Sequence, residues 1–200
     1  MNKNYFSEQS GRSMVEMLGV LAIIGVLSIG GISGYSKAMA KYRVNKTLDQ
    51  ISMLVMNIRS MYSANTNYDG LGAQIAIQMG IIPNDMLTPG AARSGASKIY
   101  NAYQGIVQLA AGGTSNQQFT VTYAGLPKEA CVTIATADWG SQAGSGLLSI
   151  AVGPNGNDKE TPGAGNTPHT VDELPLALAV AAAECSNSAD AGNTIIWTYY

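Results

Sequence analysis

The stretch Gly11-Arg12-Ser13-Met14-Val15-Glu16 leads directly into an apolar segment without a charged residue, Met17-Leu-Gly-Val-Leu-Ala-Ile-Ile-Gly-Val-Leu-Ser-Ile-Gly-Gly-Ile-Ser-Gly-Tyr-Ser36. At ~1.5 Å per residue, a helix over this segment would be about 30 Å long, which matches the hydrocarbon core of a bilayer. Glu16 stands at the edge of the segment, where a carboxylate is costly unless a cation pairs with it. The junction therefore predicts a helix of membrane-spanning length with an acid at its edge that needs a partner.

The junction resembles that of a type IV prepilin, which has a short polar leader, a glycine, and a glutamate on the fifth residue after it. The resemblance implies cleavage after Gly11, methylation of the new amino terminus at Arg12, and pairing of Glu16 with the amine of a neighbouring subunit. It also implies three partners: copies of the chain itself, a prepilin peptidase, and the pilus assembly machinery of the inner membrane. Arg12 departs from the family, because an apolar residue is typical at the first mature position.

Two other interpretations of the amino-terminal region stay open. A secretory signal peptide would have Lys3 and Arg12 in its basic region and Ala38-Met39-Ala40 as its cleavage site. Against it, the apolar segment is longer than the ~7–15 residues that are usual in signal peptides. The other interpretation is a membrane anchor that is not cleaved.

Composition favours an exported protein that packs against copies of itself. Only 12% of the residues are charged, against a typical fraction of about 25%, and 23 residues are glycine. The net charge of −2 gives no reason to expect a nucleic acid partner.

The basic residues are unevenly distributed along the chain. An acid-free stretch after the apolar segment holds four of them: Lys37, Lys41, Arg43 and Lys46. The positive-inside rule would place this side in the cytoplasm, which opposes the prepilin interpretation. We favour the prepilin interpretation because leader recognition can set the orientation and because the cysteines point to export.

The cysteines, Cys131 and Cys185, are the only two in the chain, and His169 is the only histidine. This set cannot complete a zinc site and is a poor basis for a catalytic thiol, so we expect no metal, no cofactor and no enzyme activity. Asp158 and Glu160 lack the spacing of a calcium-binding EF-hand. In an exported protein the pair most simply forms one disulfide, worth roughly 4 kcal/mol; the alternative is two buried thiols.

Helical periodicity continues past the apolar segment. One apolar stripe has the spacing of an amphipathic helix and consists of Ala40, Val44, Leu48, Ile51, Val55, Ile58 and Tyr62. We therefore predict one helix from Ser13 to Ser63, which ends at the turn residues 65–70.

The remaining chain predicts short helices and strands. The helices are expected at 73–79, 127–137 and 174–185, the last preceded by a capping box at Thr170-Val-Asp-Glu173. The strands are expected at 106–109, 119–123, 147–152 and 195–200, with a loop rich in glycine and proline over 153–169. The pattern predicts an α+β fold with an antiparallel sheet.

Several blocks resemble the carboxyl domain of type IVb pilins, especially those of conjugative thin pili: Gly80–Met86, Tyr103–Val107, Phe119–Tyr123, Leu126–Cys131 and Ile195–Trp197. The resemblance implies the type IV pilin fold: a long amino-terminal helix, its first half apolar and protruding, packed on an antiparallel sheet with short helices and a carboxyl-terminal region bounded by the disulfide. The expected parts are a removed leader (1–11), an apolar half-helix (12–36) and a globular domain (37–200) that includes the amphipathic half-helix 37–63.

The expected function is that of a structural subunit of a type IVb-like pilus. Such a subunit would be held in the inner membrane and then polymerised into an extracellular filament for adhesion, aggregation or conjugation. A minor pilin or pseudopilin of a secretion system carries the same junction, and a membrane-anchored extracytoplasmic binding module is a further alternative.

Overall fold

The computed structural model describes residues 14–87, 98–140, 145–154, 163, 168–188 and 192–200. It divides the chain into two compact units, the first ending at Lys41 and the second comprising Tyr42–Tyr200. The predicted cleavage site, Gly11 and Arg12, lies outside the described residues. The helix α1 (Met14–Tyr62) belongs to both units and agrees with the helix predicted from the periodicity.

In the first unit, α1 is apolar on all sides and its large apolar side chains are exposed. Its most apolar 18-residue window has a mean hydropathy of 2.2, and none of that window is buried. By length and composition this helix is able to cross a membrane, although a signal sequence near the amino terminus would meet the same criterion.

In the second unit, α1 buries one face. The buried residues are Thr47, Gln50, Ile51, Leu54, Val55, Ile58 and Tyr62. Val44 and Leu48 of the predicted stripe pack against this core while partly buried, whereas Ala40 is exposed. The stripe therefore identifies the packed face over its length from Val44 onward.

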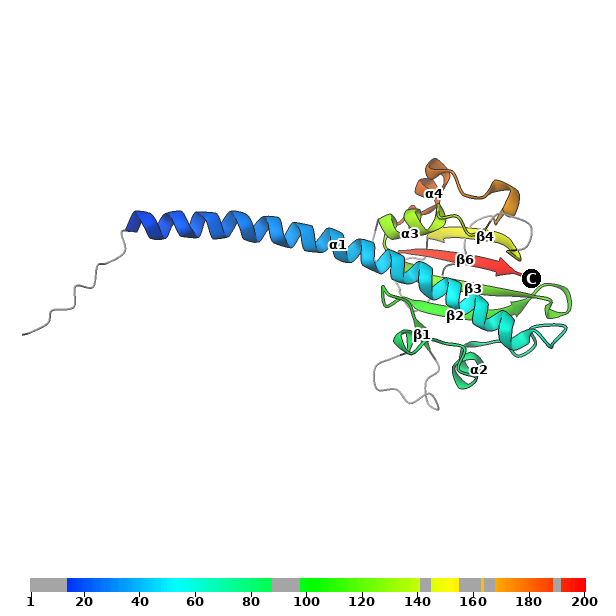
Figure 1. The fold of residues 1–200 in the computed structure, drawn as a ribbon. Helices are drawn as coiled ribbons and strands as arrows, with labels where there is room; N and C mark the ends of the chain where they lie inside the picture. The colour runs from blue at the N-terminus through cyan, green and yellow to red at the C-terminus, as the bar shows by residue number, and fades with distance from the viewer. Residues whose placement is uncertain (1–13, 88–97, 141–144, 155–162, 164–167, 189–191) are drawn as a thin grey trace, which may run out of the picture. The chain divides into compact units, whose positions relative to one another are not determined.

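That face packs on a six-stranded antiparallel sheet whose strand order is β1-β2-β3-β6-β4-β5. Its strands are β1 (Ile99–Tyr100), β2 (Ile106–Gly112), β3 (Gln118–Leu126), β4 (Leu147–Pro154), β5 (His169–Thr170) and β6 (Asn193–Tyr199). Figure 1 shows α1 crossing β2, β3 and β6, with β6 inside the sheet although it comes last in the chain.

Trp197 on β6 lies at the centre of the core. It is opposite Val121 of β3 on one side and Ile150 of β4 on the other. Its ring meets those of Tyr123 and Trp139 edge-on, with centroids 5.7 and 5.1 Å away. Because edge-to-face contacts add to the free energy of apolar burial, this aromatic group fixes how the central strands pack.

Short helices lie outside the sheet: α2 (Ala73–Gln78), α3 (Lys128–Ala135) and α4 (Leu178–Glu184), with single 3₁₀ turns at η1 (Asn84–Met86), η2 (Thr114–Asn116) and η3 (Val171–Glu173). The disulfide joins Cys131 of α3 to Cys185 at the end of α4, as the cysteine pair predicts. Both cysteines are buried, so the bond is part of the core.

The prediction of a helix over 174–185 is wrong at its start. The capping box between Thr170 and Glu173 is present, but it closes the 3₁₀ turn η3. Leu174 is then extended because the following Pro175 disfavours helical backbone angles, and α4 begins only at Leu178. The predicted strands are longer than expected, and β1 and β5 were not anticipated. The loop predicted over 153–169 lies mostly outside the described residues.

Candidate functional site

Glu16 lies in the first turn of α1 and is exposed. The unpaired backbone N–H groups at a helix start favour a negative charge by roughly 0.3–1 kcal/mol, which suits an acid at this position. No residue in the described part of the chain forms a hydrogen bond or an ion pair with its carboxylate. The acid therefore has no countercharge from within that part of the subunit.

The surface behind Glu16 consists of exposed large apolar side chains: Met14, Val15, Met17, Leu18, Val20, Leu21, Ile23, Ile24, Val26, Leu27, Ile29 and Ile32. A continuous apolar surface of this extent does not stay in water and marks a contact with a membrane or with protein. The glycines of this segment have no neighbour within 4 Å of a built Cβ atom: Gly19, Gly25, Gly30, Gly31 and Gly34. No contact with a described residue requires them to be small, whereas close packing against other helices would.

Arg59 anchors the other end of α1 to the sheet. Its guanidinium donates to the carbonyl oxygens of Ser145 (2.6 Å) and Tyr200 (3.3 Å) and lies 5.2 Å from the ring centre of Tyr199. Burial raises the pKa of Tyr199 to about 12, and the charge of Arg59 limits the increase. A Cβ atom at Gly146 would lie 1.8 Å from the Arg59 Nη2, so this glycine leaves room for the guanidinium.

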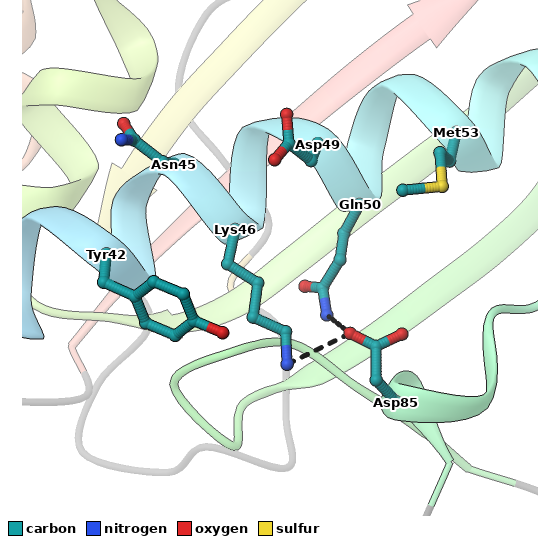
Figure 2. A pocket seen from close by; sticks show the side chains of 7 residues that line it. All are labelled: Tyr42, Asn45, Lys46, Asp49, Gln50, Met53 and Asp85. Carbon is teal, nitrogen blue, oxygen red and sulfur yellow. Dashed lines mark hydrogen bonds and ion pairs between the residues drawn. The ribbon is translucent and has the colours of Figure 1, made fainter.

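A polar contact attaches the turn η1 to the middle of α1 (Figure 2). Asp85 Oδ2 accepts a hydrogen bond from Gln50 Nε2 at 2.9 Å and forms an ion pair with Lys46 Nζ at 3.1 Å. Partial burial acts to raise the pKa of Asp85, but the hydrogen bonds from Gln50 and Lys46 and the charge of Lys46 outweigh it, so this pKa is lowered. Asp85 is therefore an anion that holds η1 against the helix.

His169 has partners that sequence reasoning missed. Its Nε2 lies 2.8 Å from Glu184 Oε1, and its Nδ1 lies 3.3 Å from Glu173 Oε2. The Nε2 contact is a hydrogen bond and the Nδ1 contact is within ion-pair distance, so the ring lies between two carboxylates. Glu173 is four residues away and could have been found from the sequence; Glu184 reaches the ring only through the fold.

The described residues contain no group of three histidine, cysteine or acidic side chains placed to hold a metal ion. Asp158 and Glu160, considered above for calcium, lie outside the described residues. Within the described part, the functional groups are thus the first turn of α1, its apolar surface, and the contacts that fix its second half.

Comparison with known proteins points to one class of molecule. A family model described as "PilS N terminal" matches residues 41–200. The chain is 26% identical over 203 residues to the major structural subunit of bundle-forming pilus from Escherichia coli O127:H6, covering 100% of this chain and 96% of that protein. The subunit of the same name from E. coli O111:H- is 27% identical over 146 residues, covering 72% and 70%.

Among solved structures, the chain is similar to a type IVb pilin from Salmonella typhi. The TM-score is 0.53 with 27% identity, and the match covers 78% of this chain and 98% of that pilin. The residues that the family model matches, 41–200, include the sheet and the disulfide-linked helices described above.

Proposed function

The chain belongs to the PilS N-terminal family and is a type IVb pilin, and we propose that it is the major subunit of its pilus, made as a membrane-held prepilin. As a structural subunit of an extracellular filament, the protein is not an enzyme. We propose further that prepilin peptidase cuts after Gly11, that the new amine at Arg12 can be methylated, and that the pilus assembly machinery then adds the subunit to the filament.

The exposed apolar half of α1 is the observation that carries this proposal. Leaving it in water is unfavourable in proportion to its area, at roughly 25 cal/mol per Å². Lipid covers it before assembly, and the α1 helices of other subunits cover it afterwards. Because each subunit then offers one surface to a different surface of the next, the assembly is open and helical rather than a closed ring.

Glu16 supplies the specific contact in this proposal. Cleavage after Gly11 creates an amino group on Arg12, four residues before Glu16 and close to where a neighbouring helix would begin. Within an apolar bundle, an unpaired carboxylate is strongly unfavourable and a paired one is tolerated. Pairing the amine of one subunit with Glu16 of the next would therefore favour the register in which both charges are satisfied.

Mass spectrometry of purified pilin tests the processing step. The mass should correspond to a chain that begins at Arg12, with or without one methyl group, and with the disulfide intact. Gly11→Val should leave the leader attached, because the bulky side chain blocks the cleavage site. Wild-type pilin that keeps residues 1–11 in cells containing the peptidase would rule out this part of the proposal.

Glu16→Gln tests the assembly step, because it removes the charge and keeps the shape. The variant should be made, processed and held in the membrane, while the yield of sheared filaments falls to near the background. Glu129→Gln is the matched control, since Glu129 is also an exposed glutamate in the first turn of a helix. Normal filaments from the Glu16 variant would contradict the role proposed for this residue.

A further inference from the structure

A pocket of about 410 Å³ opens between α1 and the turn η1, in the second unit. Figure 2 shows the side chains of Lys46 and Gln50 reaching from the helix toward Asp85, whereas the side chain of Asp49, which also lines the pocket, points away from Asp85. Tyr42 and Met53 line it at either end along α1. The pocket thus combines a polar centre with side walls that can contact an aliphatic chain.

The charges in this pocket do not balance. Asp85 and Lys46 neutralise each other through their ion pair. Asp49 is exposed, and its carboxylate has no hydrogen-bond or ion-pair partner in the part of the chain that the structure describes. The pocket therefore carries one net negative charge from its described side chains.

Gln50 gives a second, independent sign that a donor is missing. It is 2% exposed, and its Nε2 is used by Asp85. Its Oε1 is buried and accepts no hydrogen bond from any described residue. Figure 2 shows this amide between Lys46 and Asp85, at the centre of the pocket. Buried acceptors are rarely left without a donor in a folded protein, so this oxygen calls for a donor other than the described side chains.

The same chain offers a group of the required charge elsewhere. Lys37 and Lys41 lie one turn apart on one side of α1, are both exposed, and have no partner among the described residues. No acid occurs between Glu16 and Asp49 that would neutralise them locally. The two basic residues that follow them are already engaged, since Arg43 lies 6.0 Å from the ring centre of Tyr103 and Lys46 pairs with Asp85.

We propose that the pocket at Asp49 receives the Lys37–Lys41 turn of a second copy of this chain, with a lysine ammonium paired to the Asp49 carboxylate. The ammonium would supply the countercharge that Asp49 lacks, and its aliphatic stem would lie along Tyr42 and Met53. An open helical filament needs two different complementary surfaces on each subunit, and this pair provides them. The inference rests on the proposed filament function and adds a contact separate from that of Glu16.

Charge reversal with rescue tests the pairing. Asp49→Lys alone, and Lys37→Glu with Lys41→Glu, should each lower the yield of sheared filaments about tenfold or more, because like charges then meet at the contact. Combining all three changes should restore most of the yield. Adding Lys37→Glu or Lys41→Glu singly to the Asp49→Lys chain identifies which lysine is used.

Asp172→Lys and Lys128→Glu are the matched controls, because both residues are exposed and have no described partner; they should leave the yield unchanged. Pilin level, processing and thermal unfolding are measured for every variant. If Asp49→Lys fails to fold, Asp49→Asn takes its place and should give an intermediate loss that Lys41→Glu does not deepen.

Three results have distinct meanings. Normal filaments from folded Asp49→Lys pilin would overturn the pairing, and so would two defective variants whose combination stays defective. A wild-type chain that forms no filaments would instead overturn the proposed filament function, and this inference with it.

Discussion

Leu21 and Leu54 occupy the same helix in opposite circumstances. Leu21 is 62% exposed in the first unit, whereas Leu54 is fully buried against the sheet of the second. One half of α1 is thus stabilised within the subunit, whereas the large apolar side chains of the other half have no cover among the described residues. A continuous helix can therefore have two halves that are stabilised in different ways. In α1 the boundary between the halves lies near Lys41.

Removing the disulfide should have the largest effect on the folded half. A double Cys131→Ser, Cys185→Ser variant should lose roughly 4 kcal/mol of unfolding free energy, from the freedom returned to a loop with a sequence separation of 54. Denaturant unfolding followed by tryptophan fluorescence measures it, because both tryptophans lie in the second unit. An unchanged midpoint would show that the bond contributes nothing beyond the packing of α3 and α4.

The two leucines themselves give the sharpest form of the comparison. Leu54→Ala should cost about 3 kcal/mol, since it leaves a cavity in a closed core. Leu21→Ala should leave the unfolding of the second unit unchanged and reduce filament yield instead. Tryptophan fluorescence of the pilin in detergent measures the loss of stability, and a shearing assay measures the loss of filament yield. A large loss of stability from Leu21→Ala would break the division of the helix proposed here.

Substitution of Arg59 should lower the unfolding free energy by less than Leu54→Ala does. Arg59→Met keeps much of the aliphatic stem but removes the donors to Ser145 and Tyr200, and we expect a loss of roughly 1–2 kcal/mol. Arg43→Met is the matched control; it removes only the contact with Tyr103 and should cost less than about 1 kcal/mol. Equal losses from both would indicate that the attachment of α1 to β6 adds little stability.

Asp85 should give the smallest effect, visible in acid. Because its folded pKa is lowered, its contribution to stability is present above the unfolded value near 3.9 and is lost as the pH falls through the folded pKa. Its side chain is 44% exposed, so solvent screening keeps the contribution small. The stability of Asp85→Asn should depend less on pH below about 4 than that of the wild type, by thermal unfolding across that range.

The sequence was informative where structure is set by local pattern. Apolar spacing along α1 predicted its extent and its buried face from Val44 onward. Alternation of apolar and polar residues predicted the strand β3, and the pair of cysteines predicted the disulfide. The start of α4 was misplaced because the capping box was given more weight than Pro175.

Contacts between distant residues could not be predicted in this way. The ion pairs depend on turns and loops whose paths no periodicity specifies, as with Lys46–Asp85 and His169–Glu184. The two-residue strands β1 and β5 are likewise too short to leave a pattern. For this reason the pocket at Asp49 could be recognised only in the folded chain, whereas the junction that contains Glu16 could be recognised in the sequence.

The position of β6 has a consequence for the order of events in the cell. The last strand to be synthesised lies between β3 and β4, so the two halves of the sheet stay separate until residues 193–199 are available. Strand pairs this far apart in sequence form late and slowly. Until those residues are available, the chain behind α1 therefore has no completed sheet and remains without its closed core. The fold closes only once the final strand has arrived.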